Sequence, residues 1–162
     1  WRIAWYKVYH PLAYYAAYFS IRAKAFSYED MCLGKERLDE KMSIIKNTPK
    51  HEVKNADLDL LREMKIADEM YARGYEFWPL DIYKAKAKDF QVIDGKPALT
   101  SIDGMGEKAA QQVEEAAKGE PFTSLENFRN RTKAPQACIE KMKELGIMGD
   151  LSDTDQLSFD FL

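Results

Sequence analysis

Two glycines flank one apolar residue in the stretch SIDGMGEKAA, residues 101–110. Gly104 and Gly106 permit backbone conformations that are closed to other residues, and they leave backbone N–H groups uncovered. The helix expected after them adds its own free N–H groups and the positive end of its dipole. Together these groups make a phosphate-sized pocket that needs no side chain. Lys108 can reach the same phosphate, and Met105 is expected to pack inward and hold the turn.

Short helices must position this stretch. After the glycine pair the sequence predicts three of them, at about 107–118, 124–131 and 135–145. Thr123–Glu126 has the spacing of a capping box, and Pro135 fits the first turn of the last helix. Between the last two helices, Thr132 and Lys133 belong to a second predicted hairpin, which lacks a glycine pair.

Helices joined by such hairpins resemble the helix-hairpin-helix motif, which binds the DNA backbone without regard to sequence. The resemblance implies DNA contacts at Gly104, Met105, Gly106, Lys108, Thr132 and Lys133. It leaves open whether the second hairpin holds a phosphate. The alternative is that Gly104 and Gly106 only make a tight turn between helices. Because residues 99–149 are close to neutral, the unit alone is expected to hold DNA weakly.

The last residues, SDTDQLSFDFL, are acidic and too few to bury their own apolar side chains. We expect a flexible, disordered tail over 151–162. Within it, six residues resemble the longer variant of the bacterial sliding-clamp-binding motif, with expected clamp contacts at Gln156, Leu157, Ser158, Phe159 and Phe161. The alternative is that the tail packs back on the body, or that the match is incidental.

Composition excludes several classes of protein. The chain has 162 residues, 46% of them hydrophobic and 31% charged, which is typical of a globular protein. Its net charge of -3 disfavours a free-standing DNA-coating protein. Cys32 and Cys138 have no metal-like spacing and are interpreted as reduced thiols of a cytoplasmic protein. No apolar run approaches a membrane span, and no signal peptide is visible, so no membrane partner is expected.

The first part of the chain is predicted to be helical, with helices at about 1–9, 12–24 and 56–73 and one or two more within 29–55. Tyr75–Trp78 and Phe90–Ile93 are predicted strands, and Asp94-Gly95 is a turn before a third. The predicted fold is therefore mainly α with a small β element. The many aromatic residues of the first 28 positions are interpreted as core. Nucleic-acid contact is the alternative, because this stretch has basic residues and no Asp or Glu.

Four stretches, in order, resemble one family, the PolC-type DNA polymerase III. Lys7–Arg22 is similar to the end of its fingers region, and Arg73–Asp81 to a short strand segment. Ser101–Val113 resembles its helix-hairpin-helix, and Gln156–Phe161 its terminal clamp-binding peptide. Residues 29–55 match least. The chain opens WRIAWYKVYHPL, without an initiator Met and inside an amphipathic pattern, and we interpret it as a fragment of a longer protein.

The resemblance implies three parts: 1–98, the helical end of the fingers region; 99–150, a paired helix-hairpin-helix module that binds duplex; and 151–162, the clamp-binding tail. The implied partners are double-stranded primer-template DNA, the β sliding clamp and other subunits of a cytoplasmic bacterial replisome. The parent enzyme would synthesise DNA with magnesium. This chain shows no carboxylate cluster at metal-ligand spacing, so no catalytic residue, metal ligand or cofactor is expected in it. The alternatives are a module of a repair or recombination nuclease, and a protein-binding scaffold without DNA contact.

Overall fold

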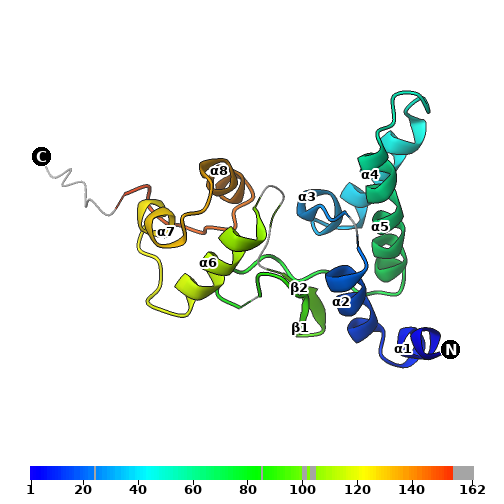
Figure 1. The fold of residues 1–162 in the computed structure, drawn as a ribbon, viewed down its shortest axis with the longest axis horizontal. Helices are drawn as coiled ribbons and strands as arrows, with labels where there is room; N and C mark the ends of the chain where they lie inside the picture. Colours follow the sequence, from blue (N-terminus) through cyan, green and yellow to red (C-terminus); the bar gives the residue numbers. More distant parts are fainter. Residues whose placement is uncertain (24, 85, 100–101, 103–104, 155–162) are drawn as a thin grey trace, which may run out of the picture.

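The computed structural model describes residues 1–154 except 24, 85, 100–101 and 103–104. Its elements, in chain order, are α1 (Arg2–Tyr9), α2 (Pro11–Ile21), α3 (Tyr28–Met31), α4 (Lys35–Asn47), α5 (Asn55–Ala72), β1 (Gln91–Ile93), β2 (Lys96–Ala98), α6 (Glu107–Ala117), α7 (Leu125–Thr132) and α8 (Gln136–Glu144). Helices α2–α5 form one group and α6–α8 another, and the two strands lie between them (Figure 1). The predicted mainly α fold with a small β element is confirmed.

The first group of helices surrounds one hydrophobic core. Helix α2 begins at Pro11, whose missing N–H is not needed in the first turn of a helix. Helices α4 and α5 pack against each other, and their buried side chains share one hydrophobic cluster with those of α2 and α3. Their fully or almost fully buried side chains are Tyr15, Phe19, Met31, Leu38, Met42, Met64, Ala67 and Met70.

Helix α1 departs from the interpretation of its aromatic residues as core. None of its residues is buried, and Trp5, Tyr6 and Tyr9 are exposed. The helix is held at its polar edge, where the Lys7 ammonium lies 2.6 Å from the carboxylate of Glu69 on α5. The interpretation is therefore correct for the rings of α2 that lie in the core and wrong for those of α1.

The two strands form an antiparallel hairpin in which Val92 pairs with Pro97. Asp94 and Gly95 make the turn with φ of 46° and 76°, a left-handed pair suited to a two-residue hairpin. The predicted strand at Tyr75–Trp78 is wrong. Two contacts join this stretch to the hairpin among the described residues. The Trp78 N–H donates to the Pro97 carbonyl at 2.8 Å, and the Lys96 ammonium lies 2.8 Å from the Glu76 carboxylate.

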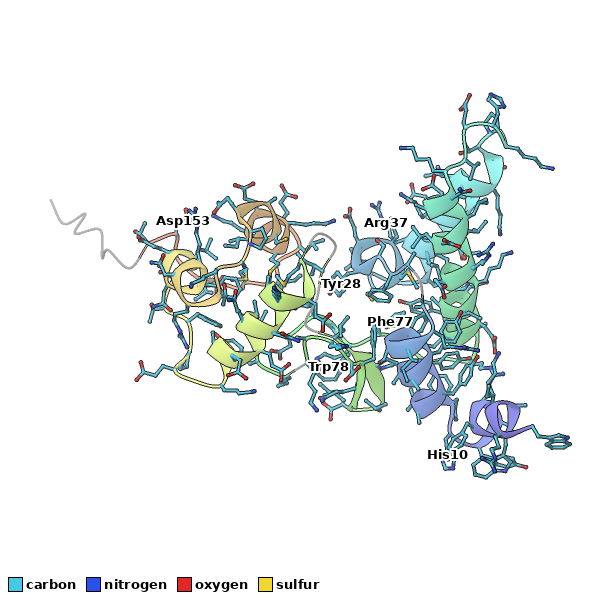
Figure 2. The ribbon with its side chains drawn as sticks, in the orientation of Figure 1. His10, Tyr28, Arg37, Phe77, Trp78 and Asp153 are labelled. Atoms are coloured by element: carbon cyan, nitrogen blue, oxygen red, sulfur yellow. The ribbon has the colours of Figure 1, made fainter. Side chains whose placement is uncertain are left out.

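Tyr28 joins the two groups of helices. It belongs to α3, yet its buried ring packs in the core of α6–α8, and its hydroxyl accepts a hydrogen bond from the Leu80 N–H at 3.0 Å. Figure 2 shows Tyr28 between the two groups. The second core also takes Leu80, Ile82 and Ala87 from the segment before β1. It therefore draws on residues well before position 99, and the predicted boundary there stays a prediction.

Arg131 fixes the packing of α6 on α7. Its guanidinium donates to the Ala116 carbonyl at 2.6 Å and to the Glu120 carbonyl at 2.8 Å. These acceptors lie at and just after the end of α6, where a cation is favourable. The same group lies 4.5 Å from the centroid of the Phe122 ring. Arg131 is thus committed to the fold and is not a free basic residue.

Residues 152–153 return to the start of α7. Ser124, and not Thr123, caps this helix, and its hydroxyl accepts from the Asn127 N–H at 2.9 Å. The predicted capping box at Thr123–Glu126 is therefore wrong, although the predicted helix start is confirmed within one residue. The next two N–H groups, of Leu125 and Glu126, donate to the carbonyls of Ser152 and Asp153. These bonds satisfy donors that a helix start otherwise leaves open. We call residues 152–154 the tail anchor.

Candidate nucleic-acid interface

The start of α6 has backbone donors that no described residue uses. Gly106 is the N-cap and extended, with φ of -66° and ψ of 157°. Among the described residues, the N–H groups of Gly106 through Ala109 find no hydrogen-bond acceptor. Gly106, Glu107 and Lys108 are all exposed. The positive end of the α6 dipole is therefore open to an anion arriving from outside.

Met105 holds this end of the helix in place. Its side chain is 7% exposed and packs in the core of α6–α8, which confirms the prediction that it packs inward. Its N–H donates to the Ile102 carbonyl at 3.0 Å. Leu99 and Ile102 are not helical. Gly104 lies outside the described residues, so its predicted role stays a prediction.

Nothing in the described part of the structure requires a glycine at position 106. Its φ is one that any residue adopts. A Cβ built on it would meet nothing within 4 Å among the described residues. Conformation and packing thus both leave room for a side chain here. What the missing Cβ does provide is close access to the backbone donors of the helix start.

The charges around this end are mixed. Glu107 occupies the first turn, and its carboxylate lies 3.2 Å from the ammonium of Lys88, which comes from the segment before β1. The Gln111 amide also donates to Glu107 at 3.3 Å. Lys108 is exposed and forms no ion pair with any described residue. The negative charge of Glu107 is thus offset by Lys88, and the Lys108 ammonium has no ion-pair partner among the described residues.

The second hairpin is built differently. Thr132 is 0% exposed, and its hydroxyl donates to the Phe128 carbonyl at 2.8 Å and accepts from the Ala134 N–H at 3.3 Å. The Lys133 N–H is bound to the Arg129 carbonyl. The Thr132 side chain is therefore engaged inside the fold, and its predicted DNA contact is not available to that side chain. Lys133, left-handed with φ of 51° and exposed, remains a predicted contact.

The predicted tail contacts lie outside the part of the chain that the structure describes: Gln156, Leu157, Ser158, Phe159 and Phe161. Within the described part, no three His, Cys, Asp or Glu residues are grouped so that they could hold a metal ion. The described residues thus do not fit a magnesium site. No described helix combines the length and apolar character that crossing a membrane requires.

A family model described as the helix-hairpin-helix motif matches residues 74–157. The chain belongs to this family. The match takes in the segment before β1, the hairpin of strands and all of α6–α8. It thus covers the open helix start and most of the residues in the core around it, with Tyr28 outside the match. The helix-hairpin-helix match begins before residue 99, as does the core described above.

Curated proteins named DNA polymerase III PolC-type are similar to nearly the whole chain. The identity is 42% over 160 residues for the protein of Streptococcus suis. It is 40% over 161 residues for Streptococcus pneumoniae and 37% for Streptococcus mutans. Each alignment covers 97% of this chain and 11% of the relative. The resemblance to PolC-type DNA polymerase III is confirmed, and the chain spans about a ninth of the length of these relatives.

Proposed function

We propose that this chain is the duplex-holding part of a PolC-type replicative DNA polymerase. The open start of α6 binds one backbone phosphate through its N–H groups, and Lys108 adds a charge. The observation that carries the proposal is Gly106, whose missing side chain is required neither by its backbone conformation nor by packing against any described residue. Other parts of a longer polymerase, in the cytoplasmic replisome, would bind magnesium and synthesise DNA.

Two other functions compete with this one. A repair or recombination nuclease can carry the same kind of helix-hairpin-helix. The names of the relatives, which align with 97% of the chain, favour the polymerase. A protein-binding scaffold needs no open donors at a helix start. The uncovered N–H groups and the free Lys108 favour phosphate binding over that role.

Duplex binding tests the proposal. We expect weak binding that is indifferent to sequence, because backbone N–H groups contact phosphates and not base edges. Fluorescence anisotropy with two duplexes of unrelated sequence should give dissociation constants within about twofold of each other. Affinity should fall as salt rises, since phosphate contacts release counterions. Absence of binding at low salt, or a strong preference for one sequence, would contradict the proposal.

We also propose that the last residues bind a sliding clamp. What supports this is the motif at Gln156–Phe161 together with the tail anchor, which ends at the molecular surface, where Asp153 lies beside α7 (Figure 2). A partner's pocket would take the apolar side chains, each giving roughly 1.5–3 kcal/mol when buried. Gln156 would orient the peptide through its amide.

A peptide of the last ten residues should bind a Gram-positive sliding clamp with micromolar affinity, because ordering a free peptide costs entropy. Isothermal titration calorimetry measures this. The double variant Gln156→Ala, Phe161→Ala should lose binding. A variant with Asp155→Asn, outside the motif, is the matched control and should bind like the native peptide. If the native peptide shows no binding at high micromolar concentration, the clamp proposal fails.

A further inference from the structure

The segment before β1 carries three lysines at alternate positions, Lys84, Lys86 and Lys88, and all three are exposed. It is held along α6 at two points. The Ala87 N–H donates to the carboxylate of Glu114 at 3.0 Å, and the Lys88 ammonium lies 3.2 Å from Glu107. The buried side chain of Ala87 adds a third attachment to the α6–α8 core. The segment therefore has a fixed place beside the helix start.

The three ammonium groups are not equivalent. Lys84 lies 3.7 Å from the Asp81 carboxylate and 5.7 Å from the centroid of the Trp78 ring, so it already has partners. Lys86 forms no ion pair or hydrogen bond with any described residue. Lys88 has only its exposed pair with Glu107, and such pairs are worth about 0–1 kcal/mol. Lys86 and Lys88 are thus available to an outside anion at little cost.

We propose that Lys86 and Lys88 bind phosphates of the same DNA duplex, next to the phosphate held by the α6 start. This inference rests on the proposed function and adds two contacts to it. The Cα atoms of the two lysines are at most about 7 Å apart. A DNA strand carries a phosphate every ~3.4 Å along its axis, so two such lysines can contact neighbouring phosphates.

Nearby carboxylates do not close this surface to DNA. Glu107 is countered by Lys88 and Gln111, and Glu114 by the Ala87 N–H and by Lys118, 3.7 Å away. Asp89 is exposed and adds one negative charge beside Lys88. In the duplex complex, Lys88 lies between Glu107 and a phosphate. Its charge then offsets the repulsion between them as well as attracting DNA.

Salt dependence of duplex binding tests this inference. In the double variant Lys86→Gln, Lys88→Gln, the slope of log affinity against log salt should be shallower by about 1.8, or ~0.9 for each lost contact. Lys84→Gln is the control within the segment, because its ammonium already has partners. Lys65→Gln, an exposed lysine of α5, controls for net charge. Both controls should leave the slope within about 0.3 of the wild type.

The outcomes separate this inference from the proposed function. If wild-type protein does not bind duplex, the proposed function fails and the inference with it. If Gly106→Asp weakens duplex binding and the double variant keeps the full slope, the function stands and the inference is overturned. An equal effect of Lys65→Gln also overturns it, since net charge would then be the cause. An unchanged melting temperature of the double variant is required for support.

Discussion

Gly106→Asp is expected to weaken duplex binding at least about fivefold while leaving the protein as stable as before, or slightly more stable. Asp is among the best N-cap residues, and a carboxylate is favoured at the start of a helix. A Cβ added at position 106 has no described atom within 4 Å, so the Asp side chain fits there. The same carboxylate stands where the phosphate should bind. Two like charges ~4 Å apart cost about 1–4 kcal/mol, between the values for water and for a protein surface.

Weaker duplex binding together with unchanged or higher stability cannot be explained by loss of the fold. Thermal unfolding measures the stability, and fluorescence anisotropy with a duplex measures the binding. Asn55→Asp is the matched control, since it adds one negative charge to the exposed first turn of α5 and should leave binding unchanged. Gly106→Asn caps the helix without a charge, so its affinity should fall between those of wild type and Gly106→Asp. Duplex binding of wild-type strength by Gly106→Asp would show that the phosphate site is elsewhere.

Phe128→Ala should lower the free energy of unfolding by about 3–5 kcal/mol, the usual cost of deleting a fully buried ring. The Phe128 side chain is 0% exposed. Its ring packs edge-on against Phe122, with the centroids 4.8 Å apart. Phe122 in turn supports the guanidinium of Arg131, which holds the end of α6. The deletion therefore leaves a cavity in the core and loosens the joint between α6 and α7. Denaturant unfolding measures the loss.

Cys138 provides a second measurement within this core. It is 3% exposed, and burial raises the pKa of its thiol, so the folded protein presents little reactive thiolate there. In Phe128→Ala, its alkylation should be at least about a hundredfold faster, as 3 kcal/mol of lost stability implies. Mass spectrometry separates this site from Cys32.

Ile44→Ala, a control at an exposed position of α4, should change the free energy of unfolding by no more than about 0.5 kcal/mol. A loss below about 1 kcal/mol for Phe128→Ala would contradict the packing described here.

Helices with clear start and stop signals could be predicted from the sequence. Helix α5 follows from the three- and four-residue spacing of its apolar side chains, and α8 from Pro135 before it and Gly146 after it. The Asp94-Gly95 turn is equally local. The strand prediction at Tyr75–Trp78 was wrong because aromatic residues are common in strands and equally common in hydrophobic cores. Phe77 packs among other rings and forms no ladder with a neighbour. Only the tertiary environment decides between these two uses of an aromatic residue.

The candidate site shows the same division. Met105 and the open start of α6 follow from the glycine spacing. The buried hydroxyl of Thr132 does not, since its acceptor is the Phe128 carbonyl one turn back, and a helix interior and a hairpin tip look alike in sequence. Lys88 was missed because its partner Glu107 is 19 residues away in the chain. The alternating lysines were the one signal in the sequence that pointed to this segment.

The tail anchor limits how far a partner bound to the last residues can lie from the body of the protein. Thr154 is the last described residue, and Gln156 follows two positions later, so the chain between them spans at most about 7 Å. A partner that binds from Gln156 onward is therefore held close to the tail anchor, which is bonded to the start of α7. There the Lys143 ammonium binds the Asp153 carboxylate and adds to the anchor. A sliding clamp that encircles the same duplex would then be restricted in its orientation relative to α6, because the segment that joins them is short.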